Sequence, residues 1–163
     1  MTLTRILLSL LVLLSCESCR YDPFADRYLT KKPRSLDVVG RYNLVLQTAI
    51  PGDLQAFKTR PIQIEFRGDG SFIATNVAPA SSSATNPPGF ANSLLSGSGS
   101  WRIGSVGGIK NVFGPEKTHW GIYLDSPGLE IQPVGLTHSR PPYGLIFTIG
   151  DPDEGTALIL ERQ

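Results

Sequence analysis

The clearest strand pair in this chain lies in residues 143–162, which read YGLIFTIGDPDEGTALILER. Large apolar side chains occupy every second position of Tyr143–Ile149, a spacing that places them on one face of a strand. Residues 150–155 form the strongest turn signal in the sequence, because proline presets φ, aspartates bond neighbouring amides and Gly155 accepts a left-handed conformation. We therefore expect Thr156–Glu161 to return as an antiparallel strand.

A two-residue period also runs through the sequence upstream of this hairpin, starting at Asp37. The turn Arg67-Gly68-Asp69-Gly70 separates two of the periodic segments, and its two glycines suit a tight hairpin loop rather than an adhesion motif. No window shows sustained helical spacing; residues 53–58 have room for a turn or two of helix at most. The period predicts further strands within Gly40–Leu46, Ile62–Phe66, Ser71–Val77, Trp101–Ile103, Trp120–Leu124 and Leu129–Ile131.

About eight short antiparallel strands predict an all-β domain over residues 37–163. The expected fold is a small up-and-down β-barrel, and the alternative is a β-sandwich. Closure of the sheet removes its edge strands, which favours the barrel. Residues 78–100 interrupt the pattern with Ala, Ser, Asn, Gly and Pro, so we expect a long flexible loop there. Both cysteines, Cys16 and Cys19, precede the domain, so its core must hold without a disulfide.

The N-terminus has the features of a signal peptide. Residues 1–20 read MTLTRILLSLLVLLSCESCR, with Arg5 as the basic start and Ile6–Leu14 as the apolar run. That run is too short to cross a bilayer, which takes about 20 apolar residues. The junction Leu13-Leu14-Ser15-Cys16 resembles the lipobox of bacterial lipoproteins. The resemblance implies that residues 1–15 are removed and that the Cys16 thiol receives acyl chains such as palmitate.

This likeness predicts a protein of the bacterial cell envelope, anchored to a lipid bilayer through acylated Cys16. The choice between inner and outer membrane stays open. Residues 16–36 carry charges of both signs without apolar periodicity and are expected to form an exposed polar tether. The alternatives at the N-terminus are ordinary secretory cleavage after Ser18 and an uncleaved anchor.

The β domain carries two further resemblances. Gly40-x-Tyr42 is similar to the Gly-x-Trp opening of lipocalins, with tyrosine in place of tryptophan. The ending 147–153, running on to 160–162, resembles small uncharacterised bacterial lipoproteins with a lipocalin-like domain. The resemblance implies a barrel that holds a small apolar ligand, and it brings no catalytic residues. The candidates to line such a cavity are Tyr42, Trp101, Trp120 and Tyr143, and the alternative for these aromatics is core filling.

Charge and motifs argue against several other functions. Without residues 1–15 the chain has fourteen basic and fourteen acidic side chains, so it lacks the basic surface that nucleic-acid binding requires. The two histidines, His119 and His138, have no metal-site spacing and are expected in exposed loops. No catalytic motif is present, so we expect neither an enzyme nor a cofactor. The alternative to ligand binding is an accessory module that presents loops 78–100 and 138–142 to another envelope protein.

Overall fold

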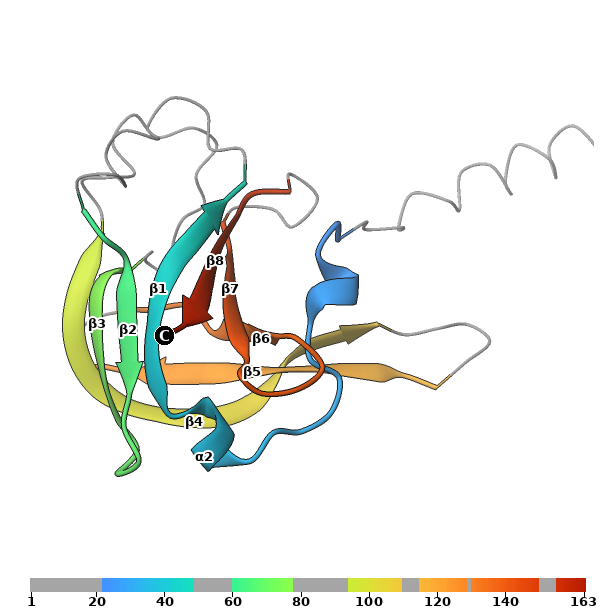
Figure 1. The fold of residues 1–163 in the computed structure, drawn as a ribbon, viewed down its shortest axis with the longest axis horizontal. Coiled ribbons are helices and arrows are strands. Elements are labelled where there is room, and N and C mark those ends of the chain that lie inside the picture. Colours follow the sequence, from blue (N-terminus) through green and yellow to red (C-terminus); the bar gives the residue numbers. More distant parts are fainter. Residues whose placement is uncertain (1–21, 49–59, 78–93, 110–114, 129, 150–154) are drawn as a thin grey trace, which may run out of the picture.

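In the computed structural model, eight antiparallel strands close into one barrel, in which each strand pairs with its neighbours in sequence and the first pairs with the last (Figure 1). The structure describes residues 22–48, 60–77, 94–109, 115–128, 130–149 and 155–163. The closed barrel confirms the predicted up-and-down fold in preference to the sandwich.

Two short helical segments precede the barrel, a 3₁₀ turn η1 (Ala25–Arg27) and a helix α2 (Ser35–Val38). The longest strand is the fourth, with 15 residues. The strands are β1 (Gly40–Gln47), β2 (Gln63–Phe66), β3 (Ser71–Val77), β4 (Leu95–Ile109), β5 (Lys117–Asp125), β6 (Val134–Thr137), β7 (Gly144–Thr148) and β8 (Ala157–Arg162).

The predicted C-terminal hairpin is present. β7 and β8 pair in the register Leu145↔Leu160 and Phe147↔Leu158, and Gly155 takes the expected left-handed conformation with φ of 66°. Because side chains alternate along a strand, these four residues point into the barrel. They join one buried hydrophobic cluster with residues from the other strands, including Tyr42, Ile64, Phe66, Phe72, Ile122, Val134 and Leu136. That cluster is the core of the barrel.

A second, smaller apolar cluster lies on the outside of the barrel. The alternate residues of β7 and β8, Ile146, Ala157 and Ile159, point outward and are nevertheless buried. They are covered by Phe24 and Tyr28, which come from the segment before β1. This covered outer face positions the candidate site described below.

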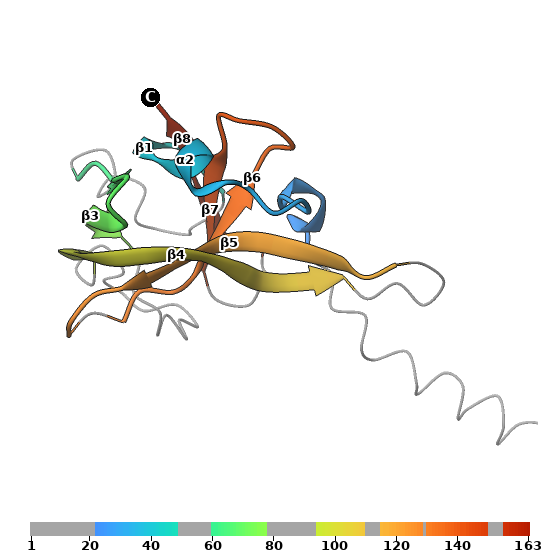
Figure 2. The same cartoon turned by 90° about the horizontal axis from the view of Figure 1, so that it is seen from below.

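The fourth strand is much longer than the predicted Trp101–Ile103. β4 begins at Leu95, so residues 95–100 belong to a strand and not to the loop expected over 78–100; residues 78–93 lie outside the described part. The sequence pattern did not predict a strand at residues 95–100, because glycine and serine predominate there and neither residue type favours β structure. The structure supplies a reason for Gly99, where a Cβ atom would clash with the carbonyl oxygen of Asp125. Figure 2 shows β4 and β5 running together past the rest of the barrel.

The sixth strand was placed wrongly by the two-residue period. It was expected within Leu129–Ile131, but β6 is Val134–Thr137. Ile131 is buried in the core ahead of the strand, and Leu129 lies outside the described residues. The neighbouring Pro133 and the internal Gly135 weaken the strand signal at this place, since both types are depleted in strands.

Strand β1 follows its predicted alternation only in its first half. Tyr42 is buried and pairs across to β8, but a β-bulge after Leu44 shifts the register. Leu46 then pairs with the outward-facing Ile159, so it points outward as well and is 46% exposed. An extra residue in a strand reverses which face the following side chains occupy.

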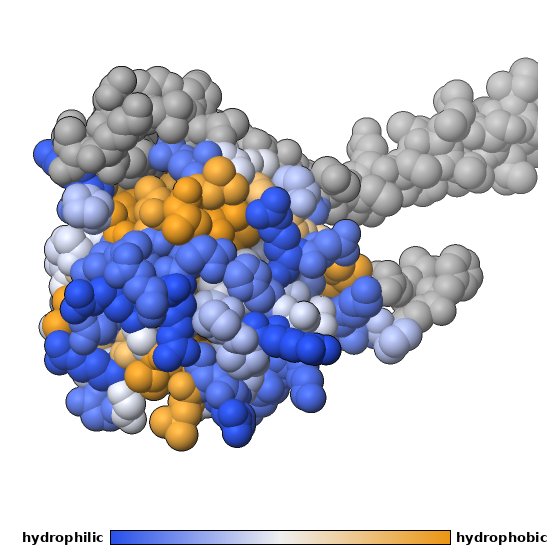
Figure 3. Space-filling view, in the orientation of Figure 1, coloured by the Kyte–Doolittle hydropathy of each residue, from blue (hydrophilic) through white to orange (hydrophobic). Residues whose placement is uncertain are grey.

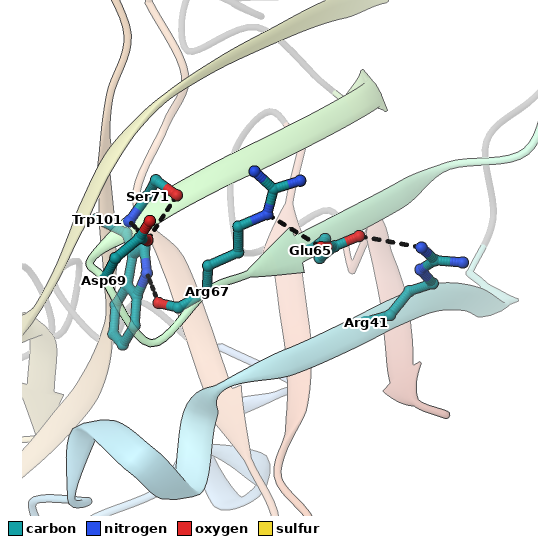
Figure 4. A network of polar contacts seen from close by, with 6 residues as sticks. All are labelled: Arg41, Glu65, Arg67, Asp69, Ser71 and Trp101. Carbon is teal, nitrogen blue, oxygen red and sulfur yellow. Dashed lines mark hydrogen bonds and ion pairs between the residues drawn. The ribbon is translucent and has the colours of Figure 1, made fainter.

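The expected hairpin turn at residues 67–70 joins β2 and β3, with Gly70 at a φ of 84°. Figure 4 shows the polar contacts around it. The Asp69 carboxylate accepts hydrogen bonds from the Ser71 backbone amide and hydroxyl, at 2.9 and 2.6 Å. The Arg67 carbonyl oxygen accepts a bond from the Trp101 indole at 3.1 Å. These bonds occupy the groups of the turn, as in an ordinary hairpin loop.

The segment Gly40-x-Tyr42 meets the last strand. Gly40 has a φ of 149°, and a Cβ atom there would lie 2.5 Å from Nε of Arg162. The Arg162 guanidinium donates a hydrogen bond to the Asp37 carbonyl at 3.2 Å, and the Tyr42 hydroxyl donates one to the Val38 carbonyl at 2.7 Å. Both bonds satisfy carbonyls of α2, so they hold the helix against the end of the barrel.

Candidate functional site

Residues 22–33 are part of the fold, so the prediction of an exposed polar tether over 16–36 is wrong for these residues, while residues 16–21 lie outside the described part. We call residues 22–33 the strap. The Leu29 amide donates to the Leu136 carbonyl at 2.7 Å, and the Leu29 carbonyl accepts from the Trp120 amide at 2.9 Å. Tyr28 forms a β-bridge with Thr137. The strap thus adds a strand-like contact between β5 and β6.

The strap lies where two neighbouring barrel strands, β5 and β6, are not hydrogen-bonded to each other along their whole length. β5 and β6 pair only through Gly121↔Gly135 and Ile122↔Val134. Beyond these residues both strands continue, and backbone groups of Leu29 bond to each of them. Buried backbone groups need partners, so the strap completes the sheet at this point.

Aromatic packing holds the strap from the side. The ring of Tyr28 stacks on the His119 imidazole, with centroids 4.6 Å apart and planes inclined by 5°. Gly135 makes room for it, since a Cβ atom there would clash with the Tyr28 ring. Burial raises the pKa of Tyr28 to about 12. Phe24, 6% exposed, covers the outer apolar cluster.

A cleft of about 650 Å³ opens beside the strap on the outside of the barrel. We call it the strap cleft. Its charged lining comprises three bases, Arg27, Lys31 and Lys117, and two acids, Asp26 and Glu161. The remaining lining residues are Ala25, Tyr28, Leu29, Thr30, Ile109, His119, Thr137, His138, Ser139 and Ile159.

One end of the strap cleft is formed by His138 and Glu161. His138 has a φ of 68°, and its Nδ1 lies 3.1 Å from the Pro142 carbonyl oxygen, so Nδ1 carries the proton of this hydrogen bond. Its Nε2 faces Glu161 Oε1 at 3.3 Å, an ion pair when the imidazole is protonated. Gly144 leaves space for this arrangement, because a Cβ atom there would crowd Thr137 and the Glu161 carboxylate.

Two residues that line the strap cleft hold buried polar atoms without a hydrogen-bond partner among the described residues. They are Nε2 of His119 and Oγ1 of Thr137, whose residues are 6% and 4% exposed. Burial lowers the pKa of His119, which favours the neutral imidazole there. A buried polar atom without a hydrogen bond costs free energy. The strap therefore covers groups that a polar ligand or a bound water molecule would satisfy.

One of the two histidines, His119, differs from the expected exposed loop residues, whereas His138 is exposed in a loop as expected. His119 is buried in β5 beneath Tyr28, and only His138 lies in a loop, the one after β6. The sequence did contain one signal for the strap that our tether prediction overlooked. Three large, mainly apolar residues lie close together in this segment, namely Phe24, Tyr28 and Leu29. Such a group is unusual in a solvated spacer.

The four aromatic residues predicted to line an internal cavity do not line the strap cleft. Tyr42 packs edge-on against Phe66 with ring centroids 5.6 Å apart, and Phe66 contacts Trp101 at 5.3 Å. Tyr143 is 6% exposed in the same core, and Trp120 packs against the core while Lys32 lies 5.3 Å from its ring. Trp101 lines a second cleft, of about 480 Å³, beside Lys32 and Asp69.

The remaining predicted site residue, Cys16, lies outside the described part of the chain. No helix within the described ranges has the length and apolar character needed to cross a bilayer. The same ranges contain no group of three His, Cys, Asp or Glu side chains placed to hold a metal ion. No protein-family model, curated protein or solved structure matches this chain.

Proposed function

We propose that this protein is a lipid-anchored binding protein of the bacterial envelope, and that its ligand site is the strap cleft. The observation that carries the proposal is the combination in one cleft of a ligand-sized volume with buried, unpartnered polar atoms of His119 and Thr137. Small-molecule sites are typically concave, several hundred Å³ in size and lined by a few polar groups. The Leu13–Cys16 junction supports the anchor.

A site inside the barrel has less support. The inward-facing side chains that the structure describes form one continuous hydrophobic cluster, in which Tyr42, Phe66 and Trp101 contact one another in sequence across the interior. Both clefts reported above are lined in part by residues of the strap, namely Lys31 in one and Lys32 in the other. Ligand binding is therefore better placed outside the sheet.

Native mass spectrometry of the mature protein purified from its host tests the site. We expect a small-molecule adduct on the wild type that is lost when Thr137→Val and Lys31→Gln are combined. Lys32→Gln is the matched control, because Lys32 is the next residue along the strap but lies against Trp120 instead of in the strap cleft. Absence of any adduct, or equal retention in the double variant, would refute the site.

The anchor is tested separately, by substituting the two cysteines in turn. Cys16→Ala should release the protein from membranes and block its maturation, as globomycin should in the wild type. Cys19→Ala is the control and should leave attachment unchanged. Membrane attachment that survives Cys16→Ala would rule out the lipid anchor at this residue.

A second candidate function is that of an accessory module, and one observation favours it. Val45 and Leu46 on β1 are 60% and 46% exposed, although both are large and apolar. Figure 3 shows apolar surface over this part of the barrel. Such patches often mark contacts between proteins. Val45→Ser with Leu46→Ser should then abolish co-purification of one defined envelope protein while leaving the small-molecule adduct in place.

A further inference from the structure

We infer that the ligand of the strap cleft is a phospholipid headgroup from the membrane that holds the anchor, bound through its phosphodiester and through a hydroxyl or ammonium group beyond the phosphate. The inference rests on the proposed function and narrows its ligand to one chemical class. It follows from two features of the described residues, the position of the strap and the charges of the cleft.

The strap leaves little free chain between the anchor and the barrel. The first described residue is Asp22, whose carboxylate accepts a hydrogen bond from the Phe24 amide at 2.8 Å. Six residue steps separate it from Cys16, and an extended chain covers at most about 3.6 Å per residue, or roughly 20 Å in all. The expected tether would have been about three times as long. A lipidated Cys16 therefore keeps the strap near the headgroup layer.

The strap cleft lies on the side of the barrel where this short connection begins. Its lining includes η1, which starts three residues after Asp22. Figures 1 and 2 place η1 beside the end of β4 and the start of β5. These strand ends supply Ile109 and Lys117 to the same cleft. Attachment through Cys16 thus brings this side, and not the α2 end of the barrel, closest to the bilayer.

The basic and acidic side chains of the strap cleft fit a headgroup with two parts, an anionic phosphodiester and a hydrogen-bond donor at its free end. Lys31 and Lys117 form no ion pair with any described residue, so both ammonium groups are available to an anion. Lysine is a common phosphate ligand. The carboxylates of Asp26 and Glu161 line the same cleft and would accept hydrogen bonds from the hydroxyl or ammonium end of a headgroup. Ile109 and Ile159 offer apolar contacts for the glycerol carbons.

The two histidines give a direct readout. They are the only histidines in the chain and both line the strap cleft, so imidazole NMR signals of histidine-labelled protein report on this site. Full-length mature protein is placed through its own anchor in nanodiscs of phosphatidylglycerol with phosphatidylethanolamine. We expect shifts of both imidazoles relative to nanodiscs of phosphatidylcholine, whose headgroup has no hydrogen-bond donor.

Variants and a soluble probe separate the possible results. In the double variant Lys31→Gln with Lys117→Gln, the shifts should require at least roughly tenfold more anionic lipid, because both ammonium groups that attract the phosphate are gone. Lys32→Gln should behave as the wild type. Soluble glycerophosphoglycerol should shift the same imidazole signals, but at a higher concentration. If the soluble compound shifts the signals and the nanodiscs do not, the cleft binds a phosphodiester that does not come from the membrane, and the inference is wrong about its source.

Equal shifts in phosphatidylcholine nanodiscs, or unchanged shifts in the double lysine variant, would overturn the inference. The proposed function would survive that outcome if the adduct found by native mass spectrometry proved to be another compound. The proposed function would fall if native mass spectrometry found no adduct that depends on the strap cleft, and if neither the nanodiscs nor a small-molecule extract of the host moved the imidazole signals.

Discussion

Tyr28 and His119, 91 positions apart in the chain, lie face to face with their ring centroids 4.6 Å apart. Tyr28 belongs to the strap and His119 to β5, so this stack ties a segment outside the barrel to a barrel strand. The neighbouring backbone bonds of Leu29 to Trp120 and Leu136 act at the same place. The strap should therefore contribute to the stability of the whole domain.

Tyr28→Ala should lower the free energy of unfolding by about 2–3 kcal/mol, because it removes a partly buried ring and leaves a space over Gly135 and His119. Tyr28→Phe keeps the stack and should cost less than half as much. Urea denaturation followed by tryptophan fluorescence measures both. If Tyr28→Ala unfolds at the wild-type urea concentration, the strap does not stabilise the barrel.

Gly135→Ala tests the fit of the strap on the sheet. A methyl group at this position would meet the Tyr28 ring and the Ile146 side chain, so the strap must shift, at a cost of about 1–3 kcal/mol. Limited proteolysis should then cleave residues 22–33 faster than in the wild type. Gly107→Ala is the control, since no atom lies within 4 Å of a Cβ there. Equal cleavage of both variants would contradict the packing described.

The stability of the protein should depend on pH through His119. Burial lowers its pKa below the ordinary value of 6.5, so the unfolded chain takes up a proton at a higher pH than the folded one. The contribution of this histidine is thus fully present above pH 6.5 and is lost as the pH falls through the folded-state pKa. Urea titrations from about pH 7.5 to about pH 5, which span the unfolded-state pKa of histidine, should show this decline in the free energy of unfolding.

His119→Gln removes the titrating group and should flatten that part of the profile, whereas His138→Gln should keep the decline due to His119. A decline of equal size in His119→Gln would assign the pH dependence to other groups. The charge of Asp22 raises the pKa of His119 and that of Lys117 lowers it, so Asp22→Asn should extend the decline to lower pH while its onset stays at the unfolded-state pKa.

Tyr42→Phe examines the junction between α2 and the barrel. The substitution removes the hydroxyl that donates to the Val38 carbonyl at 2.7 Å and leaves that buried acceptor without its partner. We expect a loss of about 1–2 kcal/mol in the free energy of unfolding, with the barrel otherwise intact. Chemical denaturation with an unchanged far-ultraviolet circular dichroism spectrum would agree with this. A neutral substitution would mean that water replaces the bond.

The sequence was informative where large apolar residues alternate with polar ones. The strands predicted within Tyr143–Ile149 and Ile62–Phe66 are present, because burying one face of a strand requires apolar residues at every second position. The sequence pattern gave wrong bounds for β4 and β6. In and beside these strands glycine, serine or proline occupy several positions, and pairing with neighbouring strands overrides their local preference. A barrel was therefore predictable from its apolar strands, but their lengths were not.

The candidate site was mostly hidden from sequence reasoning. The strap cleft combines Lys31, Lys117, Thr137 and Glu161, which come from four separate segments and share no motif. Its position depends on the insertion of Leu29 between β5 and β6, a long-range contact that no local pattern encodes. The aromatic residues chosen from their periodicity, such as Tyr42, pack in the core, because the same period serves both a cavity wall and a core.

The strap cleft, the proposed short connection to a lipid anchor and the pH dependence all require that the strap is a bonded part of the sheet. Native-state hydrogen exchange at the amides of Leu29 and Trp120 measures this most directly. Both donate hydrogen bonds in the strap contact, so both should exchange within about tenfold of Ile122, which lies in the paired part of β5. Exchange of the Leu29 amide at the rate of an unfolded peptide would contradict the account.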